Sequence, residues 1–225
     1  MIKCYLDILS SSIACVLDST CITFARPGQV GNLEGPLAAA ESRSHFGAWC
    51  IVSSPLILGM DMTNESTMAS VWPYISNREA IAVNQHWVGD PGRLLTTPLA
   101  AAPTIEIFAK LQPAGAVALL AINTATTDFN ISSNADGAVG AALGVDVDLA
   151  AVLGAQYPGL KTFCHTSCEI YDIWAQKTLG KTVKGVWKIG GLQEHASAFV
   201  LITPPTATSG NASYEQSTVD ATKAT

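Results

Sequence analysis

The pattern of apolar and polar positions changes character near residue 95. Before that point, apolar residues recur at helical spacing up to about Ser54, a continuous apolar run closed by an acid covers residues 55–61, and a second helical stretch covers about 66–76. A continuous apolar run is typical of a strand buried on both faces of a parallel sheet. Helix, buried strand and helix in succession therefore predict an α/β unit.

After residue 95 the pattern predicts short strands separated by Gly, Pro, Asn and Asp. Such a series favours an antiparallel β-sandwich. The tail, residues 206–225, is rich in Ser, Thr and Ala and predicts disorder. The expected strands lie around residues 105–107, 117–122, 129–131, 145–147, 170–174, 183–189 and 199–202.

Composition and charge narrow the classes of function. The 225 residues are 48% hydrophobic, which is enough for the core of one or two domains. The net charge is -6 and no run of Lys or Arg occurs, so nucleic acid is not an expected partner. No apolar stretch reaches the roughly 18 residues of a membrane span. The mildly apolar segment Met1 to Cys21 resembles a poor secretory signal, but Asp7 and Asp18 interrupt it.

The cysteines and three glycosylation triplets bear on the cellular compartment. Cys164 and Cys168 form a close pair, which fits either a small disulfide loop or half of a metal site. No second Cys/His pair supplies the remaining ligands, so the disulfide is favoured and no metal is expected. The triplets at Asn64, Asn130 and Asn211 are candidate N-glycosylation sites. Together these features favour a secreted, lysosomal or vacuolar protein.

Three motifs in the first part carry a family resemblance. Residues 41–49 read Glu-Ser-Arg-Ser-His-Phe-Gly-Ala-Trp, and residues 55–61 read Pro-Leu-Ile-Leu-Gly-Met-Asp. These two segments resemble the last barrel turn of glycoside hydrolase family 27, the α-galactosidases and α-N-acetylgalactosaminidases. Residues 77–85 resemble the segment that leaves the family's barrel. Their shared order and similar spacing make the match specific.

The β region extends the resemblance. Residues 105–111 and 116–123 resemble the opening strands of the family's C-terminal sandwich. Residues 171–174 and 194–196 match its later, weaker patterns, and the spacing of Cys164 and Cys168 is similar to a small disulfide loop of some members. The resemblance runs from about Gly31 to Thr203.

This resemblance implies a fold and an activity. The implied fold class is α/β plus all-β, a C-terminal remnant of a (β/α)₈ barrel over residues 26–95 and an antiparallel sandwich over 104–205. Residues 1–25 match nothing, and 206–225 form the tail. The implied reaction is retaining hydrolysis of terminal α-linked galactose in a glycan, without a cofactor. A homodimer is compatible with this organisation.

The residues needed for that reaction are missing from the matching region. A (β/α)₈ barrel takes at least about 200 residues, whereas the β region here begins near residue 104. The retaining mechanism needs two carboxyl groups about 5 to 5.5 Å apart. The family's nucleophile and acid/base aspartates lie upstream of the first residue that matches. Residues 24–32 stand where a further family motif, Trp-Asn-Asp-Pro-Asp, is expected, and they keep neither acid. We therefore assign no catalytic residue and expect this chain alone to be inactive.

Asp61 is the one residue that we assign as a candidate for lining a substrate pocket. It closes the predicted barrel strand, at the end where barrel active sites form, but capping the next helix or pairing with a cation is the favoured alternative. Glu34 and Glu41 lie on a predicted outer helix and are expected to be solvated. His45, beside Phe46 on the same helix, is expected to pack rather than to bind a ligand.

The tryptophans and the incomplete barrel leave two further alternatives open. Trp72, Trp87, Trp174 and Trp187 suit either sugar stacking or, more commonly, core and interdomain packing. One alternative function is a non-catalytic sugar-binding or interaction module built on the β-sandwich. The other is a chain whose partial barrel exposes apolar surface and does not fold stably.

Overall fold

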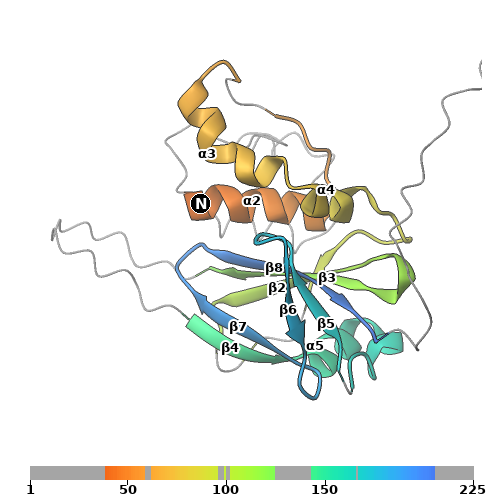
Figure 1. Cartoon of the computed structure of the whole chain (residues 1–225). Helices are drawn as coiled ribbons and strands as arrows, with labels where there is room; N and C mark the ends of the chain where they lie inside the picture. The colour runs from red at the N-terminus through yellow and green to blue at the C-terminus, as the bar shows by residue number, and fades with distance from the viewer. Residues whose placement is uncertain are drawn as a thin grey trace, which may run out of the picture.

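The computed structural model describes residues 39–58, 62–95, 99, 102–124, 143–165 and 167–205. A six-stranded antiparallel sheet with the order β1-β2-β3-β8-β5-β6 forms the middle layer. Three helices cover one face of this sheet, and a two-stranded sheet, β4-β7, lies with helix α5 against the other (Figure 1). The helices are α2 (Ala39–Ile51), α3 (Glu65–Ile75), α4 (Arg78–Gln85) and α5 (Leu149–Gln156), and the strands are β1 (Arg93–Leu94), β2 (Ile105–Leu111), β3 (Val117–Asn123), β4 (Leu143–Asp148), β5 (Glu169–Asp172), β6 (Lys177–Lys181), β7 (Val186–Leu192) and β8 (Ser197–Thr203).

Strand β3 shows why the six-stranded sheet can be covered on both faces. It pairs antiparallel with β2 on one side and with β8 on the other, and every one of its residues is buried. Because side chains alternate across a strand, Leu119 faces the core beside β4, β7 and α5, while Leu120 faces the core beneath the helices. The uninterrupted apolar run of this segment therefore follows from burial on both faces.

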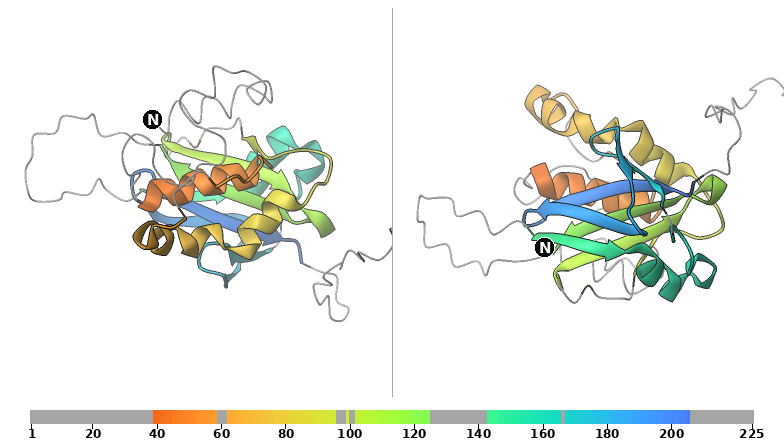
Figure 2. Two further views of the ribbon diagram at one scale, coloured as in Figure 1. Left: turned by 90° about the horizontal axis from the view of Figure 1, so that it is seen from above. Right: turned by 60° about the horizontal axis from the view of Figure 1, so that its bottom comes forward.

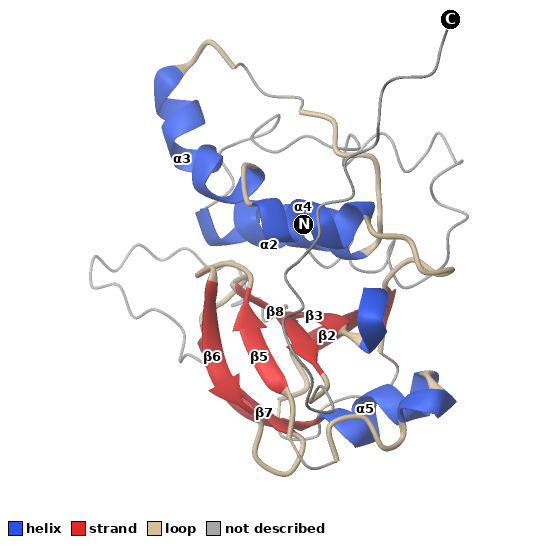
Figure 3. Ribbon diagram, turned by 45° about the vertical axis from the view of Figure 1, so that its right-hand side comes forward, coloured by secondary structure: helices blue, strands red, loops and turns tan. Residues whose placement is uncertain are grey.

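The helical layer and the sheet share one hydrophobic core. Phe46 from α2 and Tyr74 from α3 belong to the same buried cluster as Phe108, Leu120 and Phe199 of the sheet. Figure 2, seen from above, shows α2, α3 and α4 running across the sheet, and Figure 3 shows the helices stacked over the strands. The predicted division of the chain near residues 95–104 thus falls between two layers that pack directly on each other, and as a domain boundary it stays a prediction.

Asparagine side chains begin two of these helices. Asn64 caps α3, and Asn77 caps α4 by accepting a hydrogen bond from Ala80 N at 3.0 Å. Such side chains satisfy backbone N–H groups that the first helical turn leaves unpaired. Asn77 also donates to the carbonyl of Ile173 at 2.6 Å and is buried. This residue therefore fixes the start of α4 against the end of β5.

The predicted strand over residues 55–61 is not present in its described part. Residues 54–58 have no regular secondary structure, and Ile57 and Leu58 are 59% and 40% exposed. A strand of a parallel sheet needs hydrogen-bonding neighbours at its edges, and within the described ranges every strand pairing is antiparallel. The apolar run therefore lacks partners.

The strand predictions after residue 95 are mostly confirmed, with two elements missed. The structure has strands at or overlapping all the expected positions except residues 129–131, which lie outside the described residues, as do 206–225. Strand β6 was missed because all its residues are exposed and no apolar alternation marks it. Helix α5 was missed although Asp148 caps it by accepting from Ala151 N at 3.0 Å, a signal that the sequence carries. Within the described ranges, helices are too short or too polar to cross a membrane.

Candidate functional site

The residues singled out from the sequence have different outcomes in the structure. Asp61, Asn130 and Asn211 lie outside the described residues, so their predicted roles are untested. Asn64 is exposed at the start of α3, where its side-chain oxygen accepts from Thr67 N at 3.0 Å and from the Ser66 hydroxyl at 2.7 Å. Its glycosylation stays a prediction.

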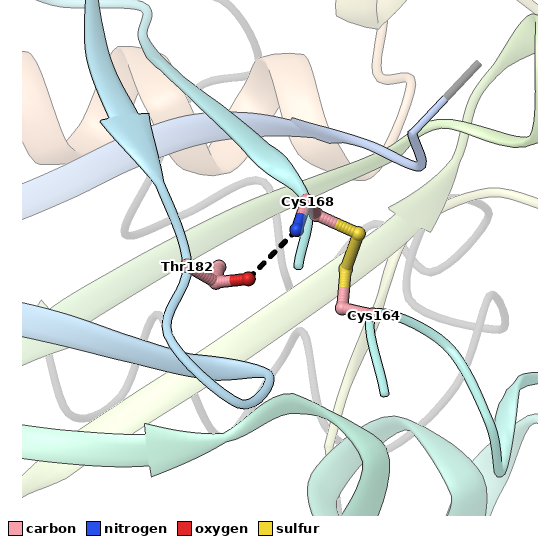
Figure 4. The surroundings of a disulfide bond; sticks show 3 residues. All are labelled: Cys164, Cys168 and Thr182. Atoms are coloured by element: carbon pink, nitrogen blue, oxygen red, sulfur yellow. Dashed lines mark hydrogen bonds between the residues drawn. A yellow bond between two sulfur atoms is a disulfide. The ribbon is translucent and has the colours of Figure 1, made fainter. Parts of the chain in front are cut away.

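Cys164 and Cys168 are joined by a disulfide (Figure 4). The Cα atoms lie 5.2 Å apart, within the usual range for such a bond. Cys168 N donates to the Thr182 hydroxyl at 2.7 Å, and Thr182 N donates to the Cys168 carbonyl at 2.7 Å. The small loop is therefore anchored to the residue that follows β6. Within the described ranges, no three His, Cys, Asp or Glu residues cluster at metal-binding distance.

A polar contact links the first helix to the turn between β7 and β8. His195 Nδ1 lies 2.7 Å from Glu41 Oε1, and its Nε2 lies 3.7 Å from Glu194 Oε1. The Ser44 hydroxyl donates to the carbonyl of His195 at 2.7 Å. All three side chains of the acid–histidine contact are between 21% and 27% exposed. Glu41, expected to be solvated, thus holds α2 on the sheet through a residue 154 positions away.

Lys110 is a buried cation between the helical layer and the sheet. It lies on β2, is fully buried, and donates through Nζ to the carbonyls of Val83 and Asn84 near the end of α4. A cation at a helix C-terminus meets carbonyls that lack intrahelical partners. Burial lowers the pKa of Lys110 to about 8, and the neighbouring Cys50 opposes this shift. Burial likewise raises the pKa of the free Cys50 thiol.

His45 has a packing role. Its Nε2 accepts a hydrogen bond from Trp49 Nε1 at 3.0 Å, so the ring is neutral at that nitrogen. Burial lowers the pKa of His45 to about 4, which keeps the imidazole uncharged at neutral pH. This environment fits the expectation that His45 packs rather than binds a ligand.

The pocket of interest lies where α2, α3 and the turn after β5 meet. It has a volume of about 290 Å³ and is lined chiefly by Arg43, Ser70, Pro73, Tyr74 and Trp174. The guanidinium carbon of Arg43 lies 5.9 Å from the centroid of the Trp174 ring, a cation–π arrangement. Among the described residues, no carboxyl group lines this pocket. The described lining therefore does not supply the two carboxyl groups of a retaining glycosidase.

The tryptophans divide between packing and exposure. Trp187 is 2% exposed within the core beside β4, and Trp174 packs between the sheet and the helices. Trp72 and Trp87 are 55% and 63% exposed. Sequence reasoning gave no reason to pair Arg43 with Trp174 or Glu41 with His195, because both pairs join distant segments of the chain.

The fold is similar to part of the fold of solved α-galactosidases. The α-galactosidase I of Mortierella vinacea aligns with 80% of this chain and 40% of its own at a TM-score of 0.60 and 21% identity. The Saccharomyces cerevisiae α-galactosidase, solved with raffinose, covers 78% of this chain and 45% of its own at a TM-score of 0.58 and 17% identity. Identities this low establish the fold alone.

Sequence comparison points to the same class of enzyme. The Schizosaccharomyces pombe α-galactosidase mel1 is 36% identical over 80 residues, which are 36% of this chain and 17% of the relative. The Oryza sativa α-galactosidase is 40% identical over 65 residues, or 29% and 15%. No family model matches the chain. These findings confirm the resemblance to the C-terminal portion of glycoside hydrolase family 27, and the chain spans less than a third of the curated relatives that it matches.

Proposed function

We propose that this chain is the C-terminal part of an α-galactosidase-like glycoside hydrolase and that it provides structure rather than catalytic carboxyl groups. The observation that carries the proposal is that the sequence and the fold are both similar to those of α-galactosidases. The reaction of the whole enzyme would be retaining hydrolysis of terminal α-linked galactose, with an α-galactoside-containing oligosaccharide as substrate. Two carboxyl groups from an upstream barrel segment would perform it.

The packing of the structure supports a structural role for this part. The helical layer and the sheet share a core, and the buried side chains of Lys110 and Asn77 connect them. A barrel placed on the other side of the helices would cover Ile57 and Leu58, which are exposed here. The β layers would then serve as a fixed base for α2 as a helix of that barrel.

The test is hydrolysis of a chromogenic α-galactoside by two proteins. The 225-residue chain alone is expected to release no more chromophore than a blank. A chimera that places the upstream part of the Oryza sativa enzyme before residue 41 is expected to release it readily. Hydrolysis by the chain alone that disappears in Asp61→Asn would overturn the proposal, as would a folded chimera without activity.

A secreted, lysosomal or vacuolar location is part of this proposal, supported by the disulfide and by the exposed Asn64 in its Asn-x-Ser triplet. Expression through a eukaryotic secretory pathway should add a glycan that an endoglycosidase removes, and Asn64→Gln should lose one such unit. An unchanged mass in that variant would count against glycosylation at Asn64. A homodimer also stays a prediction, and light scattering of the chain tests it.

A further inference from the structure

The pocket between α2, α3 and the turn after β5 contains a cation without an anionic partner. Arg43 projects from α2 and stacks on Trp174. Its Nε is shielded from solvent and has no hydrogen-bond acceptor, and within the described ranges no carboxylate forms an ion pair with its guanidinium. A partly buried charge without a counter-ion is costly. The guanidinium therefore favours an anionic ligand.

Two carboxylates close to Arg43 and Trp174 in the sequence make contacts with other groups. Glu41, two residues before Arg43, contacts His195 at 2.7 Å. Asp172, two residues before Trp174, accepts a hydrogen bond from Ala175 N at 2.9 Å. Within the described ranges neither forms an ion pair with Arg43. An external carboxylate is a fitting partner, because the planar guanidinium can donate two parallel hydrogen bonds to it.

The remaining walls suit a small ring. Tyr74 and Pro73 supply apolar surface from α3, and Trp174 supplies an aromatic surface from the turn after β5. The Ser70 hydroxyl donates to the carbonyl of Thr67 at 2.8 Å, which leaves its oxygen able to accept a hydrogen bond. A volume of about 290 Å³ is at the low end for ligand pockets, so the site has room for one ring rather than an oligosaccharide.

The aromatic wall is held in a fixed position. Trp174 Nε1 donates to the Ser197 hydroxyl at 3.3 Å, and the ring meets Phe199 edge-on with centroids 5.3 Å apart. A Cβ atom at Gly47 would lie 2.9 Å from the Trp174 ring, so glycine permits this close approach. Arg43 and Trp174 are thus positioned before any ligand arrives, which lowers the entropic cost of binding.

We propose that this pocket is a binding site for a small ring that carries a carboxylate, with Arg43 binding the carboxylate and Trp174, Tyr74 and Pro73 contacting the ring. A uronic acid sugar and an aromatic carboxylate share this chemistry. The site is separate from the proposed hydrolysis of α-galactosides, since none of its described lining residues carries a carboxyl group and its ligand is charged.

Calorimetric titration of the 225-residue chain tests the proposal, with methyl α-galacturonide, benzoate, methyl α-galactoside and acetate as probes. Saturable binding is expected for galacturonide or benzoate, and whichever binds identifies the source of the carboxylate. The neutral galactoside lacks the charge and acetate lacks the ring, so each should bind at least about tenfold more weakly, the loss expected for one charge-assisted hydrogen bond. Equal binding of acetate or of the neutral sugar would overturn the proposal.

Three variants test whether the ligand binds in this pocket. Arg43→Gln and Trp174→Leu should each weaken binding at least about tenfold, whereas Lys188→Gln, which removes an exposed cation near Asp146, should not change it. As a readout that does not depend on Arg43→Gln folding, the indole N–H resonance of Trp174 should shift on titration of the unmodified chain. Binding without that shift, or no saturable binding of either ring carboxylate, would overturn the proposal.

Discussion

The two parts of this chain contain similar apolar runs that adopt different structures. Residues 117–123 and residues 55–61 are both nearly continuous apolar segments. The first forms β3, buried throughout between β2 and β8. The described part of the second is irregular, and its Ile57 and Leu58 are exposed. The difference shows that an apolar run becomes a strand only when the chain supplies neighbouring strands for its backbone groups.

The prediction with the largest expected effect compares two substitutions by alanine, one in each part of the chain. Phe108→Ala removes a fully buried ring from the core shared by the sheet and the helices, and it should cost about 3 to 5 kcal/mol of unfolding free energy. Ile57→Ala removes an exposed side chain and should change stability by less than about 0.5 kcal/mol. Urea titration of both variants measures this. A large loss in Ile57→Ala would mean that residues 55–58 pack against something in solution.

The second test concerns the buried cation that joins the two parts. The native pKa of Lys110 is about 8, below the ordinary 10.5, so between these values the unfolded chain binds more protons than the native protein. The free energy of unfolding should therefore rise with pH across this window, by on the order of 3 kcal/mol relative to Lys110→Met. Denaturant titrations at pH 7.5 and 10.5 on both proteins measure the difference. Parallel pH profiles would show that Lys110 keeps an ordinary pKa.

The third test affects only the β part. Replacing both Cys164 and Cys168 by Ser opens a five-residue loop, since the two are four positions apart, and loop-closure entropy assigns such a bond about 2 kcal/mol. The variant should unfold at correspondingly lower urea concentration, and a reducing agent should destabilise the original chain but not the variant. Equal stability of the two chains without a reducing agent would contradict a stabilising role for the disulfide.

Some features of the structure could be predicted from the sequence and others could not. The strands around Ile107, Leu119 and Val200 were predictable because alternation and apolar runs mark them locally. The small disulfide was predictable from the spacing of its two cysteines. Strand β6 carries no local signal, because an exposed edge strand needs no apolar face. The cation–π pair of the pocket was not predictable either, since residues 43 and 174 meet only after the helices pack on the sheet.

The prediction with the smallest expected effect on stability concerns the contact between α2 and the β7–β8 turn. Glu41→Gln keeps the shape of the side chain but removes the charge that faces His195 at 2.7 Å. Because both groups are largely buried, the loss should be about 1 kcal/mol. The matched control is Asp146→Asn, which breaks an exposed ion pair with Lys188 and should cost less than about 0.5 kcal/mol.

A double-mutant cycle with His195→Gln separates this contact from other effects of the substitutions. A coupling energy near 1 kcal/mol would establish that the two parts are joined through this pair as well as through their shared core. A coupling energy near zero, with the same loss in each single variant, would assign the effect to the surroundings of each side chain. The helical layer would then be held on the sheet by apolar packing and by the hydrogen bonds of Asn77 and Lys110.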